Sequence, residues 1–181
     1  MSTTLVEQPG WSPDPNNFDQ TQILSTQGHP ALVVTVSRAP QDRFRLQPIR
    51  SITISGDPHR IGSIQGSTWF GPTIARAMAL TELNRNWNSH GAQPLDYGCL
   101  LSGLDALIAV LHPDSIAPSV FPMANGGINF EWSKAEFSIE VSADRDSGVI
   151  LSYTDSDREW DGPLEETPSY VEDAFKQLAR D

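Results

Sequence analysis

The sequence predicts an α+β fold in which an antiparallel β-meander has one face covered by helices. Apolar residues recur at intervals of three and four between residues 72 and 111, which is the period of amphipathic helices. From residue 119 apolar residues alternate with polar ones, which is the period of half-buried strands. A further helical pattern follows the strands, and helices grouped before and after a run of strands are typical of α+β proteins.

The chain is predicted to consist of an N-terminal arm and one domain. Residues 1–22 are polar and proline-containing, so they offer little apolar surface to bury and are expected to be flexible or loosely docked. Trp11 and Phe18 are the aromatic residues of this arm, and they suit docking onto another surface. Residues 23–181 are expected to form a single α+β domain.

Strands are predicted at residues 31–37 and 49–55 from their content of β-branched residues. A helix is predicted over residues 72–85, because its first residue is a proline, which suits the first helical turn, and apolar residues follow at helical spacing. A second helix is expected after Asp96, whose side chain is well placed to cap it, and leucines at intervals of three and four predict one buried face. Pro113 is expected to end this region.

The meander is predicted from three alternating segments, at residues 127–133, 136–142 and 148–154. Trp132 falls on the apolar side and is expected in the core, whereas Glu131 and Glu140 fall on the polar side. A last helix is predicted over about residues 168–179. The helices are expected to cover the apolar face of the sheet and to leave the polar face free.

The net charge of −11 is unevenly distributed along the chain. Residues 1–90 carry seven basic and six acidic side chains, whereas residues 91–181 carry five basic and 17 acidic ones. The acidic half repels phosphate backbones, so the expected partner is another protein, in particular a basic one, rather than nucleic acid. The alternative is that the acidic residues only keep the domain soluble. Arg38 and Arg60 bound the one locally basic stretch, which contains five arginines.

Several features point to a cytoplasmic protein without a membrane partner. The chain has no apolar run of the roughly 18 residues that suggest a membrane-spanning helix. Its N-terminus lacks the basic start and apolar stretch of a signal peptide. The single cysteine, Cys99, allows no internal disulfide, and its position beside leucines predicts burial rather than reactivity.

The stretch NWNSHGAQPLD, residues 86–96, lies between two predicted helices and is interpreted as a structural corner. In this interpretation Gly91 turns the chain, Trp87 packs over the turn, and Pro94 leads into the next helix. Glu131 either faces away from the core or reaches back to accept hydrogen bonds from the backbone of the corner. If it reaches back, Glu131→Gln is expected to lower the stability of the protein.

His90 and Glu131 are the weak catalytic candidates, and they would suit a hydrolase. Histidine exchanges protons near neutral pH, but the adjacency of Ser89 and His90 in sequence does not place a hydroxyl, an imidazole and a carboxylate within mutual reach. No cofactor and no metal site is expected, because the four histidines are far apart and no cysteine pair or phosphate-binding motif is present. The alternating acids of residues 155–161 resemble a calcium loop only superficially, since Trp160 stands where that loop needs glycine.

A partner-binding surface is predicted in the acidic half of the chain. The predicted contact residues are Glu140, Asp157, Glu159, Trp160, Asp161 and Glu165. Trp160 either is exposed and anchors a partner or packs over the edge of the sheet. Reversal of the acidic charges is expected to abolish binding if the surface is used.

Residues 80–155 resemble a group of small, uncharacterised bacterial proteins. Those proteins typically show W-D-G-x-G-A-x-P-I-S, an amphipathic helix, and then G-G-I-x-L-E-W followed by alternating strands. The matching residues here are Trp87, Gly91, Ala92, Pro94, Gly126, Gly127, Glu131 and Trp132. The chain departs from the pattern at residues 88–90 and at Asp96, where the group has serine. The resemblance implies no activity, and the departure at His90 argues against a catalytic role there.

The expected function is that of a non-enzymatic, acidic protein-binding module of bacterial or phage-associated type. Such a module binds or neutralises another protein, as antitoxins, immunity proteins and inhibitors do. The acidic half of the chain and the lack of a complete catalytic set favour this interpretation. Two alternatives stay open: a structural subunit of a larger assembly, with possible oligomerisation through the arm, and the hydrolase.

Overall fold

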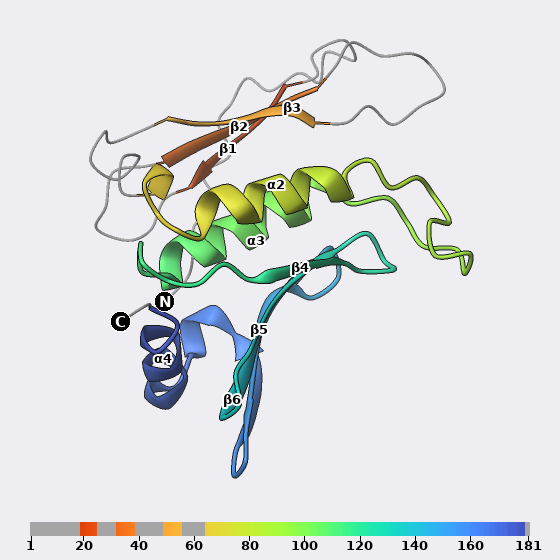
Figure 1. Ribbon diagram of the computed structural model, residues 1–181. Helices are drawn as coiled ribbons and strands as arrows, with labels where there is room; N and C mark the ends of the chain where they lie inside the picture. Colours follow the sequence, from red (N-terminus) through yellow and green to blue (C-terminus); the bar gives the residue numbers. More distant parts are fainter. Residues whose placement is uncertain (1–18, 25–31, 39–48, 56–63, 180–181) are drawn as a thin grey trace.

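The computed structural model describes residues 19–24, 32–38, 49–55 and 64–179. Trp11 and Phe18, on which the prediction of a docking arm rests, lie outside these residues. In Figure 1 a small sheet (red to orange) lies above the helices, and a larger sheet (green to blue) lies below them. The structure therefore contains two separate sheets, and the acidic half of the chain forms the larger one.

The small sheet contains the strands β1 (Asp19–Leu24), β2 (Leu32–Arg38) and β3 (Ile49–Ser55), all paired antiparallel in that order. β2 and β3 correspond to the two strands predicted from β-branched residues, so this prediction is confirmed. The sequence did not predict β1, because its polar segment DQTQIL carries only one β-branched aliphatic residue. β1 begins before residue 23, so the strand crosses the boundary proposed for the arm.

The larger sheet is an antiparallel meander of five strands in chain order. Its strands are β4 (Ser119–Pro122), β5 (Ile128–Ser133), β6 (Phe137–Asp144), β7 (Gly148–Asp155) and β8 (Glu159–Pro163). The three central strands are those predicted from alternation, and the α+β class is confirmed. The edge strands β4 and β8 were not predicted, because they are short and contain proline or glycine. Short length and proline are common features of edge strands, since they hinder pairing with another sheet.

Within the part of the chain that the structure describes, three α-helices and one short 3₁₀ helix have assigned bounds. They are α2 (Phe70–Leu80), α3 (Tyr97–Val110), η1 (Leu164–Glu166) and α4 (Ser169–Lys176). α3 agrees with its prediction, whereas α2 is shorter at its C-terminal end than the predicted helix over residues 72–85. The Thr81 hydroxyl donates to Met78 O at 2.7 Å, and after this residue the chain leaves the helix. α4 also ends earlier than predicted, at Lys176.

The helices cover one face of the five-stranded sheet, which is called the inner face below. α3 packs across β5, β6 and β7. A Cβ atom at Gly103 of α3 would lie 2.6 Å from a ring carbon of Phe130 on β5, so this glycine permits the close approach of helix and sheet. Trp132 is 2 % exposed, as predicted, and its ring meets Phe175 of α4 edge to face at 6.0 Å between centroids.

Candidate protein-binding face

The corner at residues 86–96 is held by its own polar groups. The Asn86 Oδ1 accepts a hydrogen bond from the Gly91 N–H at 2.7 Å. Gly91 has a φ of +87°, in the left-handed region that favours glycine. The Trp87 Nε1–H donates to the Gln93 carbonyl at 3.1 Å, which ties the tryptophan ring to its own loop.

Backbone hydrogen bonds join this corner to the turn between β4 and β5. The Gln93 N–H donates to Ala124 O at 2.8 Å, and the Asp96 N–H donates to Gly126 O at 2.7 Å. Gly126 has a φ of +90°, and a Cβ atom there would lie 2.8 Å from the Pro94 carbonyl oxygen. The corner and the meander are therefore one structural unit, but main-chain groups rather than a glutamate link them.

Asp96 joins the start of α3 to the turn between β6 and β7. Its Oδ1 accepts the Cys99 N–H at 3.2 Å, which confirms the predicted N-cap, and its Oδ2 accepts the Arg145 Nε–H at 2.9 Å. Burial on its own would raise the pKa of Asp96, but the bonds from Arg145 and Cys99 outweigh it and hold that pKa below its usual value. Burial, together with the nearby Asp96, raises the pKa of the Cys99 thiol to about 11.

The structure does not bring the two catalytic candidates together in a hydrogen-bonded site. Within residues 64–179, the one hydrogen bond of the His90 ring joins its Nδ1 to Asn88 O at 2.7 Å, and His90 itself is exposed. Glu131 lies on β5, directly opposite Ser119 of β4 and Glu140 of β6. Its position on the polar side agrees with the first of the two orientations considered for it, and no hydrogen bond within the same residues joins it to the corner.

The outer face of the five-stranded sheet, opposite the helices, consists of three rows of side chains that cross the strands. The first row contains Ser119, Glu131, Glu140, Ser152 and Asp161. The second row contains Phe121, Asn129, Ser142, Ile150 and Pro163. The third row contains Ser133, Ser138, Thr154 and Glu159. The name "outer face" refers to these residues throughout.

The outer face carries four acidic side chains, which are Glu131, Glu140, Glu159 and Asp161. Glu131 and Glu140 are direct cross-strand neighbours, an arrangement that repulsion between like charges makes unfavourable for the fold. Glu140 accepts a hydrogen bond from Asn129 Nδ2 at 3.2 Å, and Asp161 accepts one from Ser152 Oγ at 2.5 Å. Neither bond neutralises the charge of its carboxylate, so both acids stay available to a cation.

The basic residues in the turns of the sheet point to the inner side. Lys134, between β5 and β6, donates through Nζ to the Gln177 carbonyl just beyond α4, at 2.6 Å. Arg145, between β6 and β7, pairs with Asp96 at the start of α3. Within the part of the chain that the structure describes, no Lys or Arg occupies a position in the three rows of the outer face. The charged side chains of the outer face are therefore all acidic.

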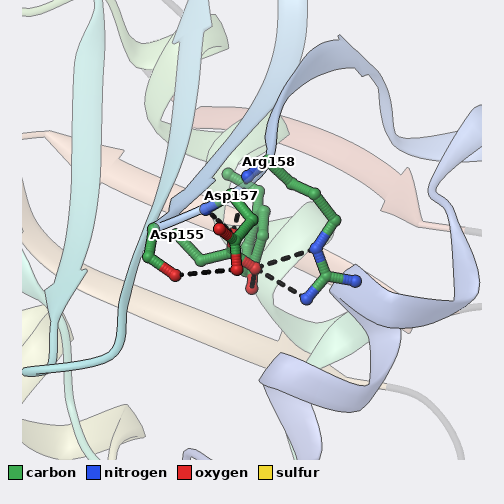
Figure 2. A network of polar contacts seen from close by, with 5 residues as sticks. Asp155, Asp157 and Arg158 are labelled. Atoms are coloured by element: carbon green, nitrogen blue, oxygen red, sulfur yellow. Dashed lines mark hydrogen bonds and ion pairs between the residues drawn. The ribbon is translucent and has the colours of Figure 1, made fainter.

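The turn between β7 and β8 has an internal charge network, which Figure 2 shows. Asp155 accepts two hydrogen bonds from the Arg158 guanidinium, at 2.7 and 3.0 Å, and one from the Tyr153 hydroxyl at 2.7 Å. The Tyr153 bond is the first cause of a pKa of Asp155 well below its usual range. The Arg158 guanidinium also lies over the Tyr170 ring of α4, 4.6 Å from its centroid. Asp155 is thus compensated within the fold, whereas Asp157 is exposed at the tip of the turn.

The predicted partner-binding residues divide between two sides of the sheet. Glu140, Glu159 and Asp161 belong to the outer face. Trp160 faces the inner side, opposite Tyr153, and is partly buried against the core. Its ring folds over its own strand, since a Cβ atom at Gly162 would lie 2.8 Å from its Cζ2. This packing favours the sheet-edge alternative over an exposed anchor.

Glu165 lies away from the outer face. It belongs to η1 and lines a cleft of about 360 Å³ on the inner side, together with Ser102 and Asp105 of α3. The sequence also missed a member of the outer face: Phe121 of β4 is 46 % exposed, the one large hydrophobic side chain of the described residues that is so exposed. Its strand is too short to show an alternating pattern, so no signal in the sequence placed it beside Asn129.

Residues 64–179 contain no group of three or more His, Cys, Asp or Glu side chains arranged to hold a metal ion. In the same region no helix combines the length and apolar character needed to cross a bilayer. Comparison of the chain with family models, curated proteins and solved structures found no significant match. The resemblance over residues 80–155 therefore stays a prediction.

Proposed function

We propose that this protein is a non-enzymatic binding module that uses its acidic outer face to hold a basic surface of another protein, in the manner of an antitoxin, immunity protein or inhibitor. The observation that carries the proposal is the uncompensated first row, in which Glu131 stands directly opposite Glu140 and Asp161 lies on the edge strand beyond. The cations of the neighbouring turns are engaged on the other side of the sheet.

The close pairing of Glu131 with Glu140 lowers the stability of the free protein. Like charges placed directly across two strands destabilise a sheet by a few tenths of a kcal/mol up to about 1 kcal/mol. A partner that places cations between Glu131 and Glu140 removes this repulsion and adds attraction in its place. A face whose charges are all negative also attracts a basic partner before contact, which raises the rate of association at low salt.

Phe121 adds an apolar component to the same face. Phe121 lies directly opposite Asn129 in the second row. The first row, which carries the carboxylates, is two residues away along the strands. Exposed aromatic side chains are frequent anchors at protein interfaces, while surrounding polar residues form the rim. The outer face thus combines charge for steering with one side chain suited to burial.

The hydrolase alternative draws no comparable support. His90 is exposed in the corner, and its ring is hydrogen-bonded to Asn88 O rather than to a carboxylate or a hydroxyl. A general base or nucleophile pair needs side chains in mutual reach. The binding function is therefore preferred on the arrangement of the described residues.

The test compares three versions of the tagged full chain as bait in lysate of the native host. The face variant carries Glu131→Gln, Glu140→Gln and Asp161→Asn. The matched control variant removes three exposed acids elsewhere, through Glu82→Gln, Glu166→Gln and Glu172→Gln. A protein captured stoichiometrically by the wild type and the control, released by high salt and lost with the face variant, supports the proposal. Equal capture by the face variant, or capture of no specific partner, contradicts it.

A further inference from the structure

We infer that the element of the partner that lies on the outer face is a basic amphipathic helix oriented across the strands, with its cations following the first row. This inference rests on the proposed function, because it names the kind of partner surface that the acidic face would hold.

The edges of the five-stranded sheet are poorly suited to adding a strand from a partner. The outermost strands are β4 and β8, of four and five residues. Pro122 ends β4 and Pro163 ends β8, and a proline cannot donate a ladder hydrogen bond. Glu159 and Asp161 on β8 add charge to that edge, a common protection of edge strands against pairing. A partner is therefore expected on the face rather than at an edge.

A helix suits a face of side chains better than an extended segment does. All interior backbone N–H and C=O groups of a helix are bonded within the helix, so it can lie against a sheet without a hydrogen-bonding strand beside it. An extended segment laid over side chains would leave its backbone groups unpaired against the face, which carries a free-energy cost. The inner face of this sheet already shows the arrangement, since α3 packs across β5, β6 and β7.

The spacing of the first row matches the repeat of a helix. Neighbouring strands lie about 4.8 Å apart, so positions in a row recur at about 0, 5, 10 and 14 Å from β5 to β8. Residues i, i+4, i+7 and i+11 share one side of a helix and lie at about 0, 6, 10 and 16 Å along its axis. Long Lys or Arg side chains can absorb the remaining difference. Three of these positions would face Glu131, Glu140 and Asp161, and the third in order would face Ser152.

The second row predicts apolar residues beside the basic stripe of the partner. Phe121 is exposed at one end of this row, and Ile150 and Pro163 lie towards the other. The rows are about 7 Å apart along the strands, which is within the reach of side chains from one helix. The ligand that fits both rows therefore carries a stripe of Lys or Arg with apolar side chains next to it.

The experiment uses the purified full chain and three fluorescein-labelled peptides of equal composition. The striped peptide places four arginines at i, i+4, i+7 and i+11 of an alanine-rich helix with leucines on the adjacent stripe. The dispersed peptide places the same arginines on opposite sides of the helix. The third peptide keeps the arginine spacing but carries two proline residues in its interior, which prevent a helix. The striped and dispersed peptides carry the same two prolines at their ends, so that all three compositions are equal. Circular dichroism verifies the helix content of each peptide, and fluorescence anisotropy gives its Kd.

We expect the striped peptide to bind at least about tenfold more tightly than either other peptide, because only this peptide can place its arginines on the first row and its leucines on the second row at the same time. The face variant should lose about tenfold in affinity for the striped peptide, while the control variant should change by less than about twofold. Thermal unfolding of both variants establishes that each is folded.

The outcomes separate the two proposals. Equal binding of all three peptides, or preference for the extended one, overturns the helix inference but leaves an acidic protein-binding face in place. The same holds if a partner is captured in a face-dependent manner while no peptide binds. If the striped peptide binds equally to the wild type and the face variant, the outer face is not its site. Failure of both peptide binding and partner capture overturns both proposals.

Discussion

Glu131→Gln is expected to stabilise the free protein, because it removes one member of the like-charged pair formed with Glu140. Side chains directly opposite one another in an antiparallel pair have Cβ atoms about 5 Å apart, and two unit charges at that distance in water repel by about 0.8 kcal/mol. Screening at physiological ionic strength reduces this to about 0.4 kcal/mol. The sign is the opposite of that expected if Glu131 bonded to the corner at residues 86–96.

The assay is urea unfolding at pH 7 of the wild type, Glu131→Gln, Glu140→Gln and the double variant. A gain of about 0.4 kcal/mol raises the unfolding midpoint by about 0.2 M, for a urea m-value near 2 kcal/mol/M. The double variant should gain little beyond either single change, because removal of one charge already ends the repulsion. In 1 M NaCl the gain should vanish.

Glu82→Gln is the control, because Glu82 is exposed and lies outside the sheet, so it reports the general benefit of removing one charge from an acidic protein. The reasoning is refuted if Glu131→Gln lowers the midpoint, or raises it no more than Glu82→Gln does at low salt. A gain that survives in 1 M NaCl would also refute an electrostatic cause. Lower stability would indicate instead that Glu131 supports the fold.

Three further predictions concern α3. Gly103→Ala should lower the free energy of unfolding by about 1–3 kcal/mol in a denaturation experiment, because the new Cβ meets Phe130 at 2.6 Å and this overpacking exceeds the gain in helix propensity; equal or greater stability would contradict the packing. Asp96→Ala should lower the free energy of unfolding by about 1 kcal/mol through loss of the helix cap. The pKa of Asp96 in the folded protein lies below the ordinary 3.8. The difference in stability from the wild type should therefore be complete above pH 3.8 and disappear as the pH falls through the folded-state pKa. A difference that persists at the lowest pH would argue against a role for the ionised carboxylate. Cys99, with its pKa raised to about 11 and its side chain buried, should react with iodoacetamide at pH 8 far more slowly than the unfolded chain does, and rapid labelling of the native protein would contradict its burial.

Local patterns in the sequence were sufficient to predict most helices and strands of residues 64–179. The leucine stripe of α3 and the capping Asp96 depend on residues three or four apart, so the helix and its start could be predicted from nearby chain. Elements without such a pattern were missed or misplaced. β4 and β8 are too short to alternate visibly, and the apolar pattern of the sequence continues past Leu80, the last residue of α2.

The candidate site was only partly predictable. Alternation with a period of two placed Glu131 and Glu140 on the polar side of their strands, because successive side chains of a strand point to opposite faces. The same rule would have turned Trp160 inward had β8 been recognised as a strand. Phe121 and Glu165 depended on elements that the sequence did not predict, so their positions on opposite sides of the sheet followed only from the structure.

The sequence by itself determined the α+β class, the buried face of each central strand and the excess of acid in the second half of the chain. These properties follow from composition and from periods of a few residues, which a single segment carries on its own. Only the tertiary structure decided that Glu131 stands opposite Glu140, that Asp161 extends their row, and that Lys134 and Arg145 turn to the helices. Strand register and the direction of turn side chains depend on contacts between distant segments, because each segment alone is compatible with several pairings and only packing selects one.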